Sequence, residues 1–407
     1  MFDDSNIIAG LEIGTSKICV VVGEQNAEGL PNIIGLGQAR SRGVRKGEIV
    51  NPEQVEEDLR AAVFEAEQMA DVEIRRVYLG VSGGHIRGFN NRGVHPVVSA
   101  DREISADDVE DVVKNAKAIN LPAENTIINH VRQHFYVDGQ EGVTNPVGML
   151  GARLEVDMHV IHGHANRLQN VIRLVRATSL DVDEIVFNGI ATSLALLSSE
   201  QKELGALVID IGGGTTEYVA YSDGIIRHSG VLAVGGDHVS NDLAYGLKVP
   251  LSRAEKLKLE HGTALPTEAA KGQTLSITNE LGLELKRVNV GHLQRIMALR
   301  IEELFQLIAQ DLEQAGLTDY LRAGVFICGG GSRVPGIVQL AENVFQMNVA
   351  AGHATAVSGL TTALDQPEFA AAIGLVKYGS LKNRRRAARP SLVSGLKGVF
   401  HKMLPRS

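Results

Sequence analysis

One stretch of the sequence decides the fold: Val208-Ile209-Asp210-Ile211-Gly212-Gly213-Gly214-Thr215-Thr216-Glu217. An apolar strand ends near an acid and is followed by three consecutive glycines. A simple hairpin turn needs only one or two glycines, and each extra one costs backbone entropy. The carboxylate of Asp210 would lie beside the turn, where it could position Mg²⁺ through water. The pattern favours a turn that serves a ligand over a plain hairpin.

Two further glycine motifs stand upstream and downstream of this stretch. Near the start, Glu12-Ile13 precedes Gly14-Thr15-Ser16-Lys17, whose backbone amides and hydroxyls could form a nest for phosphate oxygens. Taken alone, this motif is a weak signal, and a plain hairpin turn is the simpler explanation. Near the end, an apolar strand runs into Gly329-Gly330-Gly331-Ser332 and then a helix. A side-chain-free backbone there lets a flat nucleoside lie close, and no Rossmann or Walker A pattern occurs.

The composition sets outer limits on the fold and the compartment. The chain has 407 residues, which predicts two to three domains, and 44% hydrophobic with 22% charged residues excludes bulk disorder. Its two cysteines, Cys19 and Cys328, cannot build a disulfide framework or a four-ligand zinc site. The acidic N-terminus lacks the order of a signal peptide, and no run of about 18 apolar residues occurs. We therefore expect a cytoplasmic protein.

Alternating apolar strands and amphipathic helices predict an α/β fold. The strand–turn–strand pattern of residues 7–22 recurs at residues 204–221, which suggests two related halves. Residues 83–93 read as a glycine-rich loop, and the block at 85–162 differs from its flanks and is expected to be an inserted α+β subdomain. The other expected elements are strands at 77–81, 126–137, 153–161, 184–187 and 324–328 and helices at 52–70, 105–119, 164–178, 189–197, 251–261, 295–313, 335–345 and 369–378.

The C-terminal segment has its own charge and pattern. Residues 377–407 carry nine Lys/Arg and no acid, whereas the rest of the chain carries 31 basic and 48 acidic side chains. Residues 381–390 are expected to be a basic linker. On a helical projection of residues 391–404, an arc of about 140° holds every large apolar side chain, namely Leu392, Val393, Leu396, Val399, Phe400, Met403 and Leu404.

This segment is predicted to be a membrane-binding amphipathic helix. At about 21 Å it is too short to span a bilayer, but it can lie in the interface with Lys397 and Lys402 beside its apolar face. Its two glycines disfavour a free helix, so we expect it to fold on the membrane. A helix docked on the body is the alternative. Binding to nucleic acid would not need seven segregated apolar residues, and we expect none.

The three glycine motifs, in this order and at these separations, resemble the actin-like ATPase superfamily. With the inserted block and the C-terminal helix, the whole chain resembles the FtsA family of bacterial cell-division proteins. The most specific stretches are residues 10–17, 77–83, 145–148, 210–216 and 359–361. The resemblance implies an actin/Hsp70-like fold of two related halves, in which an inserted subdomain called 1C replaces actin subdomain 1B.

The resemblance also implies an ATP and Mg²⁺ site. Glu12 and Asp210 would face the metal through water, and Glu255 and Lys258 would contact ribose and base. As an alternative, that last pair is an ordinary helical ion pair. The residues implied to hold phosphate are Gly14, Thr15, Ser16, Lys17, Gly212, Gly213, Gly214, Thr215 and Thr216. Those implied to hold adenosine are Gly329, Gly330, Gly331 and Ser332.

Two departures from the family pattern indicate weak or no ATPase activity. Glu12 replaces the usual Asp and is one methylene longer. Asn188 stands where efficient hydrolases often carry a Glu or Gln that orients the attacking water. Because phosphoryl transfer depends on positioning and charge stabilisation, we expect slow hydrolysis and a nucleotide that serves as a conformational switch.

The resemblance implies the division of the chain and its partners. The implied subdomains are 1A (1–84, 163–203 and 360–380), 1C (85–162), 2A (204–243 and 323–359) and 2B (244–322). The basic linker (381–390) and the amphipathic helix (391–407) would follow them. The expected partners are copies of the chain in a filament, the C-terminal tail of FtsZ, the anionic inner membrane and later division proteins. Arg295 and Arg300 on 2B are candidates for meeting the FtsZ tail, although exposed helix charges are the simpler explanation.

These properties place the chain at the cytoplasmic face of the inner membrane, peripherally, at the division septum. Two other classes remain open. A pilus-assembly scaffold of the same superfamily would have no lipid anchor of its own, so the C-terminal helix argues against it. A sugar kinase would need a base beside a substrate hydroxyl, and an Hsp70-type ATPase would need a substrate domain, although only about 30 residues follow Val376.

Overall fold

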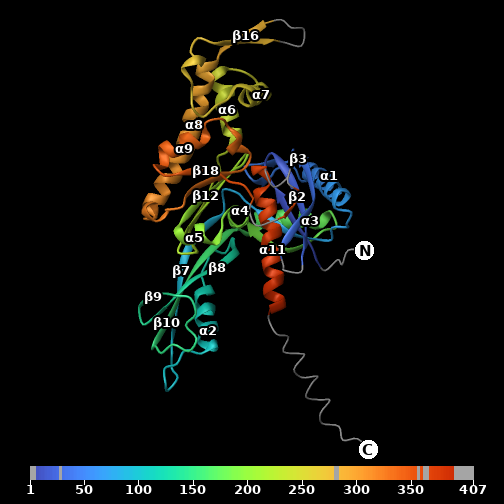
Figure 1. Ribbon diagram of the computed structural model, residues 1–407. Coiled ribbons are helices and arrows are strands. Elements are labelled where there is room, and N and C mark those ends of the chain that lie inside the picture. Colours follow the sequence, from blue (N-terminus) through green and yellow to red (C-terminus); the bar gives the residue numbers. More distant parts are fainter. Residues whose placement is uncertain (1–5, 27–29, 279–283, 355–357, 361–365, 389–407) are drawn as a thin grey trace, which may run out of the picture.

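The computed structural model describes residues 6–26, 30–278, 284–354, 358–360 and 366–388 (Figure 1). The predicted C-terminal amphipathic helix, with every residue assigned to membrane binding, lies outside these ranges. Among the described residues, no helix is long and apolar enough to cross a membrane.

The first half is built on a six-stranded mixed sheet in the order β11-β6-β1-β2-β3-β19. Helices cover its two faces, and strand glycines let them approach closely. A side chain at Gly37 would meet the α1 backbone at Ala62, and one at Gly10 would meet α11 at Ala372. The elements are β1 (Ile7–Ile13), β2 (Lys17–Gln25), β3 (Pro31–Arg40), β6 (Arg76–Val81), β11 (Asp181–Phe187), β19 (Ser358–Gly359), the small pair β4 (Val44–Arg45) and β5 (Glu48–Ile49), α1 (Pro52–Ala70), α3 (Ala165–Ala177), α4 (Asn188–Leu196) and α5 (Ser199–Leu204).

The second half repeats this plan with a five-stranded sheet in the order β14-β13-β12-β17-β18. In each half an antiparallel hairpin, β1–β2 or β12–β13, lies beside a parallel strand, β6 or β17. This repetition confirms the predicted fold of two related halves. The elements are β12 (Ala206–Ile211), β13 (Thr216–Ser222), β14 (Ile225–Leu232), β15 (Thr274–Thr278), β16 (Glu284–Asn289), β17 (Gly324–Cys328), β18 (Val349–Ala351), α6 (Gly236–Leu247), α7 (Leu251–His261), α8 (Val290–Gln314) and α9 (Ile337–Phe345).

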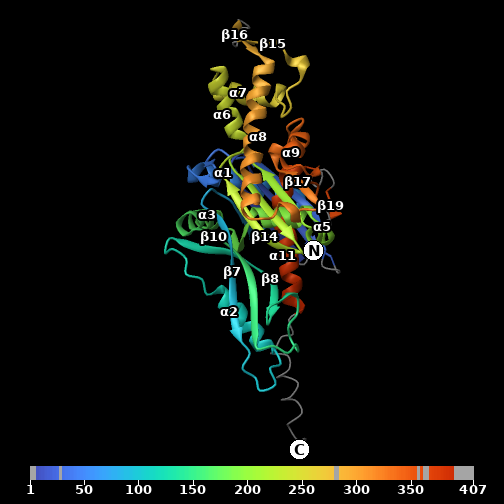
Figure 2. The same ribbon diagram turned by 90° about the vertical axis from the view of Figure 1, so that its left-hand side faces the viewer.

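The helix predicted at 295–313 begins five residues earlier than expected. Asn289 caps α8 by accepting a hydrogen bond from the backbone amide of His292 at 2.9 Å, and the helix therefore starts at Val290. The pair β15–β16 precedes it and stands at one end of the elongated molecule (Figure 2).

The inserted block forms an antiparallel sheet, β7-β10-β8-β9, with one face covered by α2. It projects at the end opposite β15–β16 (Figures 1 and 2). Residues 83–93 were predicted to be a loop, and this is wrong for most of them, since β7 begins at Arg87. Gly93 lies where a side chain would meet the α2 backbone, so it marks close packing and not a turn. The elements are β7 (Arg87–Pro96), α2 (Ala106–Lys117), β8 (Asn125–Val137), β9 (Gln140–Val143) and β10 (Arg153–His164).

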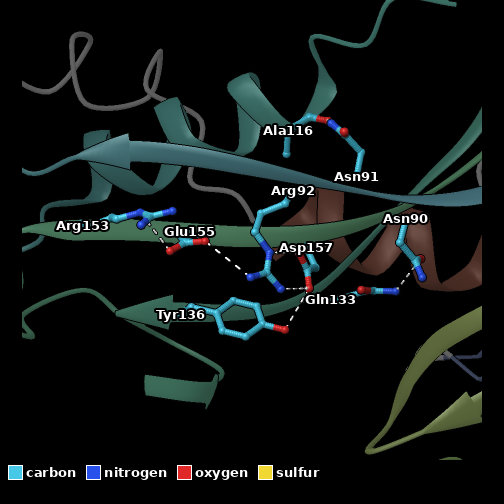
Figure 3. Close-up of polar contacts among 9 residues, drawn as sticks. All are labelled: Asn90, Asn91, Arg92, Ala116, Gln133, Tyr136, Arg153, Glu155 and Asp157. Atoms are coloured by element: carbon cyan, nitrogen blue, oxygen red, sulfur yellow. Dashed lines mark hydrogen bonds and ion pairs between the residues drawn. The ribbon is translucent and has the colours of Figure 1, made fainter. Parts of the chain in front are cut away.

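The sheet face away from α2 carries a polar network (Figure 3). Arg92 donates two hydrogen bonds to Asp157, at 2.6 and 2.7 Å, and stacks over the ring of Tyr136. The Tyr136 hydroxyl donates to the same carboxylate at 2.8 Å, and Glu155 pairs with Arg153 at 3.0 Å. These charges satisfy one another within the inserted sheet.

Nearer the body, buried polar contacts tie the inserted block to the second half. The ring of His159 lies between Asn90 and Ser229. Its Nδ1 is 2.7 Å from the side-chain oxygen of Asn90, and its Nε2 is 2.7 Å from the hydroxyl of Ser229. Gln133 donates to the carbonyl of Ile226 on β14 and to the side chain of Asn90. Burial lowers the pKa of His159 to about 3, so the ring stays neutral and both its nitrogens serve these contacts.

The segment predicted to be a linker is helical over most of its length. Helix α11 (Ala370–Ala388) continues through residues 381–388, because no proline or glycine interrupts them and Lys, Arg, Leu and Ala favour helices. Its middle is fixed by Glu184, which accepts hydrogen bonds from the Tyr378 hydroxyl at 2.6 Å and from Lys382 at 3.0 Å. The polypeptide therefore leaves the body as a helix.

Candidate functional site

A cavity of about 540 Å³ lies between the two hairpin turns. We call it the cleft. Most of the residues predicted to bind nucleotide or metal line it: Glu12, Gly14, Thr15, Ser16, Lys17, Asp210, Gly212, Gly213, Thr215, Glu255, Lys258, Gly329, Gly330 and Gly331. Three predicted residues are not among those that line it. Gly214 packs toward Thr15 and Lys46, the buried Thr216 hydroxyl donates to the carbonyl of Val234, and the Ser332 hydroxyl donates to the carbonyl of Gly329.

The two turns approach each other so closely that side chains would not fit between them. A Cβ at Gly213 would lie 3.2 Å from the Cβ of Ser16, and one at Gly214 would lie 2.5 Å from the hydroxyl of Thr15. The Thr15 hydroxyl also accepts a hydrogen bond from the backbone amide of Gly47 at 2.9 Å. The glycines therefore let one hairpin from each half present its backbone to the same space.

A buried ion pair lies at the first turn. Lys17 Nζ is 3.2 Å from Glu12 Oε2, and both side chains are largely buried. Burial alone would lower the pKa of Lys17, but the negative charge of Glu12 outweighs it and holds the pKa above its ordinary value. Lys17 is therefore a permanent cation at the edge of the cleft.

Asp210 faces this pair from the second half. Thr192 Oγ1 donates to Asp210 Oδ2 at 2.8 Å, and both residues are buried. Burial and the negative charge of Glu12 raise the pKa of Asp210 to about 6. A cation beside Asp210 and Glu12 would relieve this repulsion, so the two carboxylates favour a positive ligand.

The sequence prediction missed Glu217, which also lines the cleft. It pairs directly with Asp210 across the β12–β13 ladder and accepts a hydrogen bond from the Ser82 hydroxyl. Burial and the charge of Asp210 raise the pKa of Glu217 to about 8. The sequence did contain a signal for Glu217. Asp210 and Glu217 are equally far from the centre of the turn, so their side chains must lie on the same face of the hairpin.

This raised pKa predicts how stability depends on pH. In the metal-free protein, folded Glu217 keeps its proton up to about pH 8, whereas the unfolded chain has already lost it. Stability should therefore fall as pH rises from 6.5 to 8, by about 1 kcal/mol. Urea unfolding in EDTA at the two pH values measures this fall, and Glu217→Gln should remove it. An equal fall in both proteins would contradict the assignment to Glu217.

The predicted adenosine side of the cleft contains glycines and one ion pair. A Cβ at Gly330 would meet nothing within 4 Å, so its backbone borders open space. Glu255 and Lys258 do pair with each other, at 2.7 Å, and both also line the cleft. Lys258 in addition donates to the carbonyl of Gly236 at 3.1 Å. The helical ion pair and a binding role are therefore compatible.

Asn188 lies at the base of the cleft, at the first position of α4. Its side-chain oxygen is buried and has no hydrogen-bond partner among the described residues. This oxygen packs against Gly80, where a Cβ would lie 2.3 Å from it, so it is a buried acceptor that no protein group satisfies among the described residues.

The two arginines proposed to meet a partner differ in their surroundings. Arg300 pairs with Asp242 at 2.5 Å and with Glu303 at 2.5 Å, and it also lines the cleft. Arg295 is exposed, and no ion pair joins it within the described part of the chain. Arg295 is thus the better placed of the two to meet an external acid.

Two family models and several curated proteins match this chain in sequence. Residues 207–374 match the family described as "Cell division protein FtsA", and residues 83–162 match the "SHS2 domain inserted in FTSA". The cell division protein FtsA of Pseudomonas aeruginosa is 37% identical over 376 residues, covering 92% of this chain and 90% of that protein. The Escherichia coli K12 protein is 35% identical over 383 residues, covering 92% and 91%.

Solved structures show the same fold at low sequence identity. A PilM-PilN type IV pilus biogenesis complex matches with a TM-score of 0.66 and 18% identity, over 92% of this chain and 98% of that chain. MreB5 of Spiroplasma citri bound to ADP matches with a TM-score of 0.56 and 13% identity, over 95% and 100%. The sequence relatives decide the family: this chain belongs to the FtsA family and is an actin-like protein of bacterial cell division.

Proposed function

We propose that the cleft binds ATP with Mg²⁺ and that the chain polymerises at the inner membrane, where it anchors FtsZ filaments and recruits later division proteins to the septum. The observation that carries the nucleotide part is the meeting of two glycine turns, one from each half, beside Lys17 and two carboxylates. The structure of MreB5 bound to ADP gives a nucleotide to a protein of the same fold.

The residues of the cleft fit such a ligand. Gly213 brings to the cleft a backbone amide that can donate a hydrogen bond to a phosphate oxygen, and Lys17 adds a fixed positive charge. The carboxylate oxygens of Glu12 and Asp210 could position Mg²⁺ through its bound water, while phosphate would supply direct oxygen ligands. The described residues contain no group of three or more His, Cys, Asp or Glu that could hold a metal ion. Bound Mg²⁺ would neutralise charge on the phosphates.

Within the cleft, the chain's own residues favour retention of nucleotide over its hydrolysis. Asn188 has no ionisable group with which to accept a proton from water. Glu217 is held by a hydrogen bond from the Ser82 hydroxyl. We therefore propose that ATP acts as a switch for assembly and is hydrolysed slowly.

Gly330→Val tests the nucleotide site without disturbing the fold. Because a Cβ at this position meets nothing within 4 Å, the variant should unfold at the temperature of the unmodified protein. The added side chain should block the adenosine side and weaken ATP binding at least tenfold, as measured with a fluorescent ATP analogue. A variant that retains full affinity would exclude a nucleoside at residues 329–332.

Gly331, the residue after Gly330, supplies a contrasting control. A Cβ at Gly331 would lie 2.3 Å from Ile211 Cγ2, so Gly331→Val should lower the unfolding temperature as well as the affinity. Only the Gly330 variant separates binding from folding.

The membrane and FtsZ parts of the proposal rest on the ends of the molecule. Helix α11 carries Arg384 and Arg385 exposed near its end, and the amphipathic segment at 391–404 follows it in the sequence. Arg295 offers an exposed positive charge on α8 for the acidic FtsZ tail. Likeness to the pilus protein concerns the fold alone, whereas the FtsA relatives match in sequence over 92% of the chain.

A further inference from the structure

Asp210 has close neighbours on two sides, and the sequence did not show that either one meets it. On one side, Thr192 Oγ1 donates to Oδ2 at 2.8 Å, and Thr192 is fully buried. On the other, Gly329 approaches so closely that a Cβ there would lie 2.3 Å from Oδ1. One oxygen of this carboxylate is therefore hydrogen-bonded, and the other lies close to the backbone of Gly329.

The hydroxyl donor comes from the other half of the molecule. Thr192 lies on α4, which follows strand β11 of the first sheet, whereas Asp210 is the second-to-last residue of strand β12 in the second. Asp210 also has two acidic neighbours, Glu12 and Glu217, whose charges oppose its ionisation. A donor at this point stabilises the ionised carboxylate and holds it in one orientation.

We propose that Thr192 is a positioning residue for Mg²⁺: its hydroxyl orients Asp210 toward the metal that accompanies nucleotide. This inference rests on the proposed nucleotide site. When a residue that orients a carboxylate of a metal site is removed, the metal affinity of the site typically falls 10–100-fold. Because Thr192 and Asp210 belong to different halves, the metal site would also be complete only when the halves lie as they do here.

The same helix provides a matched control. Ser193 is the next residue, is equally buried and also carries a hydroxyl. That hydroxyl donates to the carbonyl of Ile190 at 2.9 Å and lies 2.9 Å from the Tyr221 hydroxyl, so it does not serve Asp210. Ser193→Ala therefore removes a buried hydroxyl from α4 without touching the carboxylate.

The test compares ATP binding with excess Mg²⁺ and with EDTA in the full chain. Thr192→Val, which keeps the size of the side chain, should weaken binding 10–100-fold with Mg²⁺ and less than about twofold in EDTA. Thr192→Ser should restore Mg²⁺-dependent binding. Ser193→Ala should leave the ratio of the two affinities unchanged. If Thr192→Val does not fold, Thr192→Ala set against Thr192→Ser gives the same contrast.

The possible results distinguish the role of Thr192 from the nucleotide site on which that role depends. Equal losses with and without Mg²⁺, or no loss in either condition, would overturn the role of Thr192 while leaving the nucleotide site intact. Failure of the unmodified chain to bind ATP under any condition would instead overturn the nucleotide site itself. A loss confined to Mg²⁺ and rescued by serine supports positioning.

Discussion

A chain in which Lys17 is replaced by methionine should lose about 3 kcal/mol of unfolding free energy and bind ATP at least 100-fold more weakly. Lys17 is the cation that faces Glu12, and Asp210 lies close enough to add its own charge. Removing one partner of a buried ion pair typically costs about 3–5 kcal/mol, because the remaining charge stays buried without compensation. The lower figure applies here, since the Lys17 and Glu12 side chains keep 19% and 15% of their exposure.

Urea unfolding and ATP titration of the same variant check both parts. The double variant Lys17→Met with Glu12→Gln should regain most of the stability, because no charge is left unpaired at the turn. It should not regain ATP affinity, because the cation for phosphate is still missing. A single variant as stable as the unmodified protein would show that the pair does not support the turn.

The sequence located the cleft well because its chemistry is local. Glycine turns and the acids before them can be read from a few consecutive residues, and Gly212, Gly213 and Asp210 do line the cleft. Glu217 was overlooked although it closes the same motif, because its role depends on pairing with Asp210 across the hairpin. Cross-strand pairs are visible only when the centre of the turn is known.

Other features could not be read because their partners are distant in the chain. Thr192 is an ordinary helix residue until the fold brings Asp210 to it. Gly88 looked like a loop glycine, but a Cβ there would lie 2.3 Å from the Ser229 hydroxyl, where the inserted block meets β14. In both cases tertiary packing, and not local preference, fixes the residue type.

The helical end of α11 changes what the C-terminal segment can do. A basic, proline-flanked stretch suggested a flexible tether, yet helix formers without glycine extend α11 to Ala388. Glu184 holds this helix through Tyr378 and Lys382. A C-terminal segment that binds the membrane would therefore be joined to the body through α11, which Glu184 holds in place. Truncation within α11 would damage the body, so the cut belongs after Ala388.

Removal of residues 389–407 should abolish binding to vesicles that contain anionic lipid, and one charge on the apolar face should do nearly the same. The full chain should pellet with such vesicles, because the apolar face enters the interface and each Lys or Arg near the surface adds about 1 kcal/mol. Phe400→Glu should remain in the supernatant. Ser394→Glu is the matched control, because it adds the same charge to the polar face and should still pellet.

The same sedimentation assay, repeated with Mg-ATP and with FtsZ filaments, connects the anchor to the other proposed activities. Mg-ATP should increase pelleting if assembly multiplies the weak anchors of single chains. FtsZ should pellet only when the full chain is present, and Arg295→Glu should reduce its recovery while leaving membrane binding unchanged. If the full chain, the truncated chain and Phe400→Glu all behave alike, the C-terminal segment does not bind lipid. It would then pack on the body or meet a protein, and the anchoring of FtsZ would have to come from another surface.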